Sequence, residues 1–419
     1  MTASPNMIRM NSLPAPWHDR RILLGVTGGI AAYKMGTIAS TLAKEQAQVR
    51  TILTAAAQQF VSPLTFSTLC RHPTYTDTDF WSGQHPRPLH IDLGEWAELI
   101  VLAPVTANSL AKLALGIADN LLTNTVLAST CPLLLAPAMN TDMWEQASVQ
   151  QYWQTLLAHP RYHCIPPVPG ILACDRQGIG RMAEPSSLLT WIESILHSGG
   201  QRDWQGRRVL VTAGGTKEYW DPVRFLGNPA SGRMGVALAL AAAHRGATVT
   251  LVGAGFTPEA LPHGLAFEGV TTALEMEKAL TDLFPQQDWL LMAAAVADVR
   301  PAQRSPVKVP KADLPECLML EDVPDLVAQL AAQKRDHQRV VGFAAQTGEI
   351  IGPAQEKLRR KKLDAIVANP VDQPVGGFGS VWNQGVILDR LDRQQKIDPC
   401  TKLSMAHQIL DFIAPLGNR

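Results

Sequence analysis

This 419-residue sequence has no excess of positive or negative charge, because its 37 basic and 37 acidic side chains cancel. The chain as a whole therefore offers no net electrostatic attraction to nucleic acid or to an acidic membrane. Its six cysteines are scattered, and no two of them form a C-x-x-C pair. This spacing argues against a disulfide framework and a structural zinc site, and it favours a reducing cytoplasm.

Long hydrophobic runs are also missing. Uninterrupted apolar stretches such as 236–243 and the longest one, 289–297, are far short of the roughly 20 residues that a membrane-spanning helix needs. Residues 1–20 contain three prolines and no apolar core of the kind that a signal peptide has. We expect a soluble, cytoplasmic protein with a loose leader over 1–20 and with neither membrane nor nucleic acid as a partner.

Two signatures of nucleotide binding are absent as well, namely G-x-G-x-x-G and the P-loop G-x-x-x-x-G-K-[ST]. Instead, one sequence pattern occurs near the start of each half of the chain. Residues 21–29 form an apolar run that ends in glycines, and residues 208–215 repeat this pattern. Glycine and serine just before the second opening are typical of a linker. We predict two domains, 21–198 and 199–419.

Both halves alternate short apolar runs with amphipathic stretches. Nearly continuous apolar runs predict strands that are covered on both faces, as in a parallel sheet between helices. The predicted fold class is therefore α/β, with two doubly wound, Rossmann-like domains. The predicted strands are 22–26, 49–53, 99–103 and 133–136 in the first half, and 209–212, 248–252, 289–294, 340–343, 365–368 and 386–389 in the second.

Such sheets bind ligands beyond the carboxyl ends of their strands. Gly28 and Gly29 follow the first strand and allow the backbone to approach an anion, for which a mononucleotide phosphate fits better than NAD or ATP. Thr54 follows the second strand and is a candidate for the same phosphate, although an ordinary helix N-cap explains it equally well.

Polar side chains also follow the next two strands. Thr106, Asn108 and Ser109 come after an alanine–proline pair at 103–104, and Asn140 comes after a second such pair at 136–137. Because both strands end in an alanine–proline pair, we predict that the two loops after them are neighbours and line one pocket.

The motifs at 28–34, 89–93, 137–144 and 173–182 together resemble the phosphopantothenoylcysteine decarboxylases, a family of flavin-binding cysteine decarboxylases, over the first 190 residues. The resemblance implies a flavodoxin-like domain with bound FMN. It also implies that Cys174 is the proton donor, His90 the active-site histidine and Asn140 the residue that holds the substrate carboxylate. The family has Gly-Asp after this cysteine, where this sequence has Asp175 and Arg176.

The motifs of the second half occur in an order similar to that in the phosphopantothenate–cysteine ligases. They lie at 212–218, 221–235, 293–298, 307–311, 340–347 and 357–369. The resemblance implies CTP and magnesium, with metal ligands that the sequence does not identify. Cysteine and 4'-phosphopantothenate are the other implied substrates, joined through an acyl-cytidylate. The resemblance implies that Asn228 handles the acyl intermediate and that Lys308 stabilises charge. The residues that it implies for nucleotide binding are Ala294, Asp298, Lys308, Phe343, Lys357 and Lys361.

Together the two halves resemble bacterial fusion proteins that carry both activities of coenzyme A biosynthesis, and this resemblance implies a homo-oligomer. Two alternatives stay open at this point. One is an NAD(P)-dependent oxidoreductase, because glycine turns after strands are common among nucleotide binders. The other is a catalytically decayed flavoprotein that regulates a partner.

Overall fold

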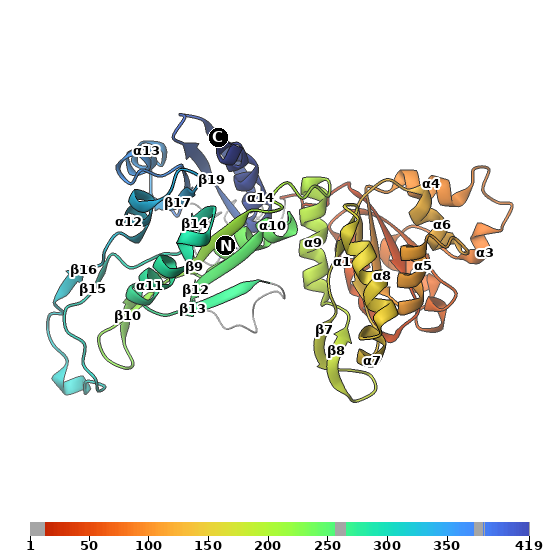
Figure 1. Cartoon of the computed structure of the whole chain (residues 1–419), viewed down its shortest axis with the longest axis horizontal. Coiled ribbons are helices and arrows are strands. Elements are labelled where there is room, and N and C mark those ends of the chain that lie inside the picture. Colours follow the sequence, from red (N-terminus) through yellow and green to blue (C-terminus); the bar gives the residue numbers. More distant parts are fainter. Residues whose placement is uncertain (1–12, 256–264, 373–379, 381, 419) are drawn as a thin grey trace, which may run out of the picture. The chain divides into compact units, whose positions relative to one another are not determined.

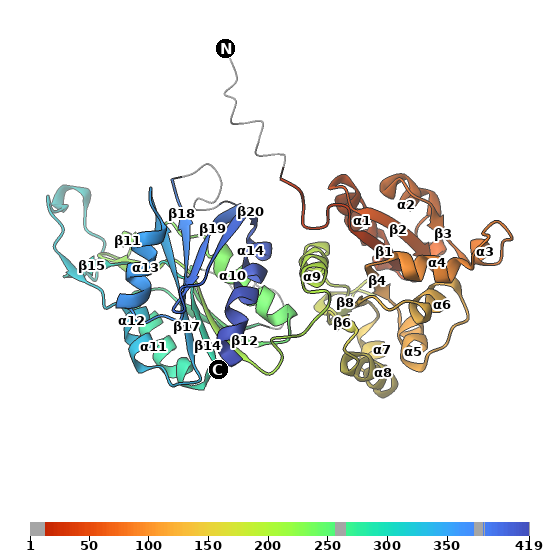
Figure 2. The same cartoon turned by 90° about the horizontal axis from the view of Figure 1, so that it is seen from above.

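The computed structural model describes residues 13–255, 265–372, 380 and 382–418. The chain divides into two compact units, one over Pro14–Gln201 and one from Arg202 onward, both drawn in Figures 1 and 2. The last helix of the first unit ends at Ser198, and Gly199 and Gly200 follow it with φ angles of 61° and 76°. Trp17, within the expected leader, is buried in the core of the first unit, and residues 1–12 lie outside the described range.

A parallel sheet with the strand order β3-β2-β1-β4-β5-β6 forms the centre of the N-terminal unit. Its strands are β1 (Arg21–Val26), β2 (Gln48–Leu53), β3 (Thr74–Tyr75), β4 (Leu99–Val105), β5 (Leu133–Pro137) and β6 (Tyr162–Cys164). Successive side chains of a strand point to opposite faces, and β1 shows this directly, because Ile22 and Leu24 pack in one core and Leu23 in the other.

Helices cover both faces of this sheet (Figure 2). One core contains side chains of α1 (Met35–Lys44), α2 (Pro63–Cys70) and α9 (Pro185–Ser198). The other contains α4 (Leu89–Trp96), α5 (Ala107–Leu115), α6 (Leu121–Ala128) and α8 (Ala147–Ala158). The short helices η1 (Ile30–Lys34), η2 (Ala57–Gln59), α3 (Asp77–Phe80) and α7 (Thr141–Trp144) lie in the connections, and β7 (Val168–Ile171) pairs with β8 (Gln177–Arg181) as a separate hairpin.

An eight-stranded sheet, ordered β13-β12-β9-β14-β17-β18-β19-β20, forms the centre of the C-terminal unit. Its strands are β9 (Arg208–Gly214), β12 (Thr248–Ala254), β13 (Ala266–Val270), β14 (Trp289–Met292), β17 (Arg339–Gln346), β18 (Ala365–Pro370), β19 (Trp382–Asp389) and β20 (Gln394–Thr401). Six of them are parallel, whereas β19 and β20 run antiparallel to their neighbours.

The helices of this unit again divide between the two faces of the sheet. One core contains α10 (Arg233–His244) and α14 (Lys402–Ile413), and the other contains α11 (Ala273–Leu283), α12 (Leu326–Gln333) and α13 (Ile351–Arg360). Small elements complete the unit, namely β10 (Lys217–Tyr219), β11 (Phe225–Gly227), β15 (Val299–Pro301), β16 (Leu320–Asp322), η4 (Phe284–Gln286), η5 (Lys311–Asp313) and η6 (Ala414–Asn418). Residues 299–322, from β15 to β16, extend away from the sheet (Figure 1), and we call them the arm.

The predicted fold class, two doubly wound α/β domains, is confirmed, and every predicted strand coincides with an observed one. One expectation about the sheet was wrong, because strand 386–389 belongs to β19, which is antiparallel. A parallel neighbour needs a crossover of about a dozen or more residues, usually a helix. Only residues 371–381 separate β18 from β19, so the chain turns back instead.

None of the helices in the described part of the chain combines the length and the apolar character that crossing a bilayer requires.

Candidate active sites

The glycine turn after β1 places two residues with different roles. A Cβ atom on Gly28 would lie 2.5 Å from Cβ of Ala56, so only glycine fits against the loop after β2. A Cβ atom on Gly29 would meet no atom within 4 Å. The backbone at Gly29 therefore faces open space, as a phosphate-binding turn requires.

Thr27, just before these glycines, joins the loops that follow β1 and β4. Its buried hydroxyl donates to the carbonyl of Pro104 at 2.7 Å and accepts from the Thr106 N–H at 3.0 Å. Sequence reasoning missed Thr27, although it stands in the motif that predicted Gly28. Its partners lie 77 and 79 residues away in sequence, so only the folded chain reveals its role.

The hydroxyl groups predicted for this edge of the sheet are held by local hydrogen bonds. Thr106 caps α5, where its Oγ1 accepts from the Ser109 N–H at 3.2 Å and donates to Ser109 Oγ at 3.1 Å. Asn108 is exposed. Thr54 Oγ1 accepts from the Ala57 N–H at 3.2 Å and donates to the Val26 carbonyl at 3.5 Å, but the N-cap of the short helix η2 is Ala56 and not Thr54.

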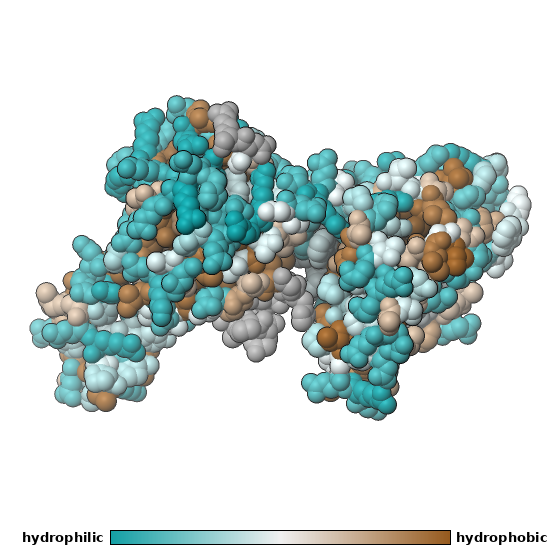
Figure 3. Space-filling model, viewed as in Figure 1, coloured by the Kyte–Doolittle hydropathy of each residue, from teal (hydrophilic) through white to brown (hydrophobic). Residues whose placement is uncertain are grey.

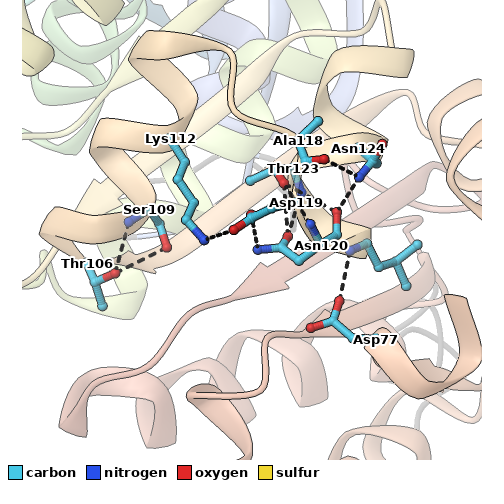
Figure 4. A network of polar contacts seen from close by, with 10 residues as sticks. Asp77, Thr106, Ser109, Lys112, Ala118, Asp119, Asn120, Thr123 and Asn124 are labelled. Carbon is cyan, nitrogen blue, oxygen red and sulfur yellow. Dashed lines mark hydrogen bonds and ion pairs between the residues drawn. The ribbon is translucent and has the colours of Figure 1, made fainter. Parts of the chain in front are cut away.

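A polar network holds the neighbouring helices in place (Figure 4). Lys112 of α5 forms an ion pair with Asp119 at 2.6 Å, and Asn120 caps α6 by accepting from the Thr123 N–H at 2.9 Å. Asp77 Oδ1 accepts from the backbone of α6 at 2.8 Å. These contacts tie the last turn of α5 to the loop before α6 and hold the start of α6.

His90 is the second residue of α4, and its ring meets the ring of Phe80 edge-on with 5.4 Å between centroids. Its Nδ1 is buried and has no hydrogen-bond partner among the described residues. An unsatisfied buried polar atom costs about 1–3 kcal/mol. His90 is therefore suited to accept a partner from outside the chain.

Asn140 and Cys174, predicted to act together, are in contact. Asn140 caps α7 with its Oδ1, which accepts from the Asp142 N–H at 2.7 Å, and its Nδ2 donates to Cys174 Sγ at 3.6 Å. Cys174 is exposed and lies in the tip of the β7–β8 hairpin. An amide and a thiol thus face each other beyond the carboxyl end of β5.

The β7–β8 hairpin lies directly on the loop before α7. The Met139 N–H donates to the Gly180 carbonyl at 3.0 Å, and a Cβ atom on Gly180 would lie 2.2 Å from the Met139 carbonyl oxygen. At the tip, Arg176 forms an ion pair with Asp142 at 2.8 Å. Asp175 has a φ angle of 61°, in the left-handed region that favours glycine. Aspartate is among the few other residues that tolerate this region, so the tip accommodates the departure from the family sequence.

The C-terminal unit contains a cavity of about 460 Å³ beyond the carboxyl ends of β9, β14, β17 and β18. Pockets for small ligands are typically about 300–1,000 Å³, so this cavity is large enough for a nucleotide. Six predicted residues line it, namely Asn228, Ala294, Asp298, Phe343, Lys357 and Lys361.

The glycine turn after β9 is required by close backbone contacts. Gly214 has a φ angle of 84°, and a Cβ atom there would lie 2.0 Å from the Ala254 carbonyl oxygen. Gly235, in the first turn of α10, lies against β9 so closely that a Cβ atom would be 2.5 Å from the Thr212 carbonyl oxygen. The turn and the helix therefore form one wall of the cavity.

Hydroxyl groups from β9 and the turn after it orient the backbone of 294–297. Thr212 Oγ1 accepts from the Ala294 N–H at 3.0 Å, and Thr216 Oγ1 accepts from the Ala297 N–H at 3.0 Å. Both threonines are buried, and sequence reasoning missed both. Asn228 Nδ2 donates to the Val296 carbonyl at 3.3 Å, which holds the amide against the same segment.

Lys357 and Lys361 lie four positions apart at the carboxyl end of α13, and both line the cavity. Lys361 forms an ion pair with Asp325 at 2.8 Å, and Asp325 also caps α12. Arg359 and Arg360 are exposed. Two further cations that sequence reasoning missed, Arg233 and Lys402, line the cavity as well.

Lys308 is not among the residues that line the cavity; it is exposed on the arm. Its neighbour Val309 is held by the loop between β10 and β11. Asp221 Oδ2 accepts from the Val309 N–H at 3.4 Å, and Arg224 donates to the Val309 carbonyl at 3.2 Å. Burial opposes ionisation of Asp221, but hydrogen bonds from three backbone N–H groups and the nearby Arg224 outweigh it and lower the pKa of this carboxyl.

Both halves of the sequence match known families. The flavoprotein family matches residues 10–197, and the family described as DNA/pantothenate metabolism flavoprotein C-terminal domain matches residues 204–416. The coenzyme A biosynthesis bifunctional protein CoaBC of Bacillus subtilis is 40% identical over 404 residues, which cover 96% of this chain and 98% of that protein. The chain belongs to this bifunctional family.

Two solved structures are similar to the separate halves. A PPC decarboxylase mutant complexed with pantothenoylaminoethenethiol is 37% identical, with a TM-score of 0.39 over 42% of this chain and 97% of its own. The C-terminal domain of a CoaBC protein is 32% identical, with a TM-score of 0.44 over 52% of this chain and 98% of its own.

Proposed function

We propose that the chain catalyses two steps of coenzyme A biosynthesis. The C-terminal unit would join cysteine to 4'-phosphopantothenate at the expense of CTP, and the N-terminal unit would decarboxylate the product to 4'-phosphopantetheine. The observation that carries this proposal is the 40% identity to a bifunctional relative across 96% of the chain. The contact between Asn140 and Cys174 and the lined cavity support it independently.

FMN is the cofactor that we propose for the N-terminal unit. The match to the flavoprotein family supports a flavin. The open backbone at Gly29 suits the phosphate of a mononucleotide, with the hydroxyl groups of Thr106 and Ser109 at the neighbouring strand end. When bound, FMN supplies the two-electron oxidation and reduction of the carbon–sulfur unit of the substrate.

The residues of this chain would orient the substrate and move the proton. Asn140 would hold the substrate carboxylate through Nδ2, which in this structure donates to Cys174 Sγ. Carbon dioxide leaves, and Cys174 would donate the proton that the enethiol takes up at carbon as it is reduced to the saturated thiol. His90, whose Nδ1 has no hydrogen-bond partner among the described residues, would balance the negative charge of the substrate.

In the ligase reaction, the pantothenate carboxylate attacks the α-phosphorus of CTP. Pyrophosphate leaves, and the amine of cysteine then displaces CMP from the acyl-cytidylate. Lys357 and Lys361 would bind the phosphates, and Asn228 would hold the acyl group. Because the Ala294 N–H already donates to Thr212, we expect the Ala294 carbonyl to accept from the amino group of cytosine.

Magnesium is the metal that we propose for the ligase step. Mg²⁺ commonly binds through substrate phosphates together with one or two carboxylates and several waters. The carboxylates of Asp298 and Asp325 line the cavity, so the donor set fits an ion that arrives with the triphosphate. Its role would be to neutralise charge as pyrophosphate leaves.

Coupled turnover tests the proposed function. Purified protein should be yellow from bound flavin, should form 4'-phosphopantothenoylcysteine only when CTP is present, and should release carbon dioxide from that product. Bound NAD and no flavin would favour an oxidoreductase. A folded, flavin-loaded protein with neither activity would favour a regulatory flavoprotein.

Assembly into a homo-oligomer stays a prediction. Large apolar side chains are exposed on the N-terminal unit, among them Trp81 and Leu127, and the region of α3 and α6 shows apolar surface in Figure 3. Such patches are typical of interaction surfaces.

A further inference from the structure

The Cys174 thiol lies in a closed turn at the tip of the β7–β8 hairpin. The Leu172 N–H donates to the Arg176 carbonyl at 2.8 Å, and the Asp175 N–H donates to the Leu172 carbonyl at 3.0 Å. These two backbone hydrogen bonds hold residues 172–176 together as one unit. A contact that holds the Arg176 side chain therefore also fixes the position of the thiol, two residues before it.

Two side-chain contacts join this turn to the start of α7. The first is the hydrogen bond from Asn140 Nδ2 to Cys174 Sγ at 3.6 Å. The second is the ion pair between Arg176 and Asp142 at 2.8 Å, in which both side chains are 68% exposed. Because the two contacts use different residues at both ends, the ion pair can hold the turn when the hydrogen bond is broken.

The base of the hairpin is held separately. Arg181, the last residue of β8, donates to the Glu184 carboxylate at 3.0 Å, and Lys34 forms an ion pair with the same carboxylate at 2.9 Å. The Met139 N–H also donates to the Gly180 carbonyl at 3.0 Å. Since the base is anchored in this way, the position of the thiol depends on the two contacts at the tip.

Substrate binding competes with one of these two contacts. In the proposed reaction, Asn140 Nδ2 holds the substrate carboxylate, while Asn140 Oδ1 keeps its bond from the Asp142 N–H at 2.7 Å. A carboxylate is a strong, charged acceptor, whereas the thiol sulfur is only a weak one. The bound substrate therefore weakens the contact between the amide and Cys174 at the stage when the thiol is needed, and the ion pair at the tip remains.

We propose that Arg176 and Asp142 are positioning residues, whose ion pair keeps the Cys174 thiol at the substrate after the substrate has taken the Asn140 amide. The inference rests on the proposed decarboxylase function. In that reaction the thiol gives its proton to the substrate carbon after carbon dioxide has left, the two electrons come from the reduced flavin, and water reprotonates the remaining thiolate. A thiol that moves away lets the oxidised enethiol escape before this step.

Arg176→Gln and Asp142→Asn in the full-length protein test the pair, with 4'-phosphopantothenoylcysteine as the added substrate. Each variant should release carbon dioxide at nearly the original rate. The ratio of oxidised enethiol to 4'-phosphopantetheine, measured by mass spectrometry, should rise about two- to fivefold, as for loss of an exposed ion pair. The double variant should show the same rise as either single one, because both residues act through one contact. Arg176→Lys should restore most of the original ratio.

Salt supplies a second readout, because it screens an exposed ion pair. Raising the ionic strength from about 0.01 M to about 1 M should raise the product ratio in the original protein and leave it unchanged in Arg176→Gln. The matched control is Arg359→Gln, which removes an arginine that is 73% exposed and lies 3.7 Å from Asp392 in the other unit. This control should respond to salt as the original protein does.

An unchanged product ratio in both single variants would refute the positioning role, and so would a double variant in which the two single effects multiply. A parallel fall in flavin binding and carbon dioxide release would show that the ion pair only maintains the fold, which also overturns the proposal. If the original protein releases no carbon dioxide from 4'-phosphopantothenoylcysteine, the proposed function itself fails, and the positioning role fails with it.

Discussion

The role of the Cys174 thiol can be tested by a single substitution. Cys174→Ser keeps the size of the side chain but removes an acidic proton donor, since a hydroxyl gives up its proton far less readily than a thiol. We expect the variant to bind flavin and to accumulate the oxidised enethiol, which mass spectrometry of the products detects. Cys317→Ser is the matched control, because Cys317 is also an exposed free cysteine but lies on the arm. Normal amounts of reduced product from Cys174→Ser would contradict the proton-donor role.

Asn228 offers the corresponding change in the ligase cavity. Asn228→Asp replaces an amide that donates to the Val296 carbonyl by a carboxylate, which repels that carbonyl and the phosphates of the substrates. We expect CTP-dependent ligation to fall on the order of a hundredfold, the scale of losing one polar group that stabilises a transition state. Decarboxylation of added 4'-phosphopantothenoylcysteine is the internal control. An equal loss of both activities would indicate misfolding rather than a role in ligation.

Motif matching at the residue level identified side chains that converge, and it missed those that hold them in place. Asn140 and Cys174 were predicted together and are in contact. Thr27 and Thr212 were missed because their hydroxyl groups bond to backbone groups 77 to 82 residues away. Nothing local distinguishes such a threonine from any other strand residue. The same limit hid Lys402, which reaches the cavity only because β20 returns along the edge of the sheet.

Among the elements, the arm carries a predicted site residue that does not line the cavity. Lys308 was predicted to stabilise charge at the nucleotide, yet it is exposed on the arm and does not line the cavity. The buried carboxylate of Asp221 and the guanidinium of Arg224 hold the next residue, Val309. The arm is therefore anchored beside Lys308, and its remaining length extends away from the sheet (Figure 1).

If Lys308 acts on the bound nucleotide, Lys308→Gln should lower kcat for ligation on the order of a hundredfold and leave the affinity for CTP unchanged, since the charge acts during the reaction and not on binding. Lys311→Gln, three residues along the same arm, is the control. Calorimetric titration with CTP and steady-state kinetics supply the two readouts. Unchanged kcat in Lys308→Gln would remove this residue from the mechanism.

Elements with regular apolar periodicity were predictable, and irregular ones were not. Strands such as β4 and β14 are apolar throughout, because both faces are covered. The direction of β19 depends on the length of the connection before it, and the β7–β8 hairpin depends on pairing between two short segments that contain glycine. Neither feature leaves a periodic signal in the sequence.

At the scale of the whole molecule, each unit has its own sheet, its own cores and its own candidate site. The two activities should therefore be separable by substitution. A mixture of Cys174→Ser and Asn228→Asp proteins should convert 4'-phosphopantothenate, cysteine and CTP to 4'-phosphopantetheine, because the first variant releases an intermediate that the second consumes. Chromatography of the products measures this. If each variant alone is inactive for the pathway and the mixture is too, then the intermediate does not pass through solution.

The contact between Asn140 and Cys174 spans only 34 positions of the chain. The loop that carries the amide, the hairpin that carries the thiol and the glycines that let one rest on the other all lie within residues 139–181. The same stretch also contains α8 and β6, which pack in the core of the unit and pair with β5. Replacing residues 139–181 as one piece by those of a relative should preserve the contact between the amide and the thiol. Replacing only the loop of Asn140 or only the hairpin of Cys174 should disturb the packing of the hairpin on that loop.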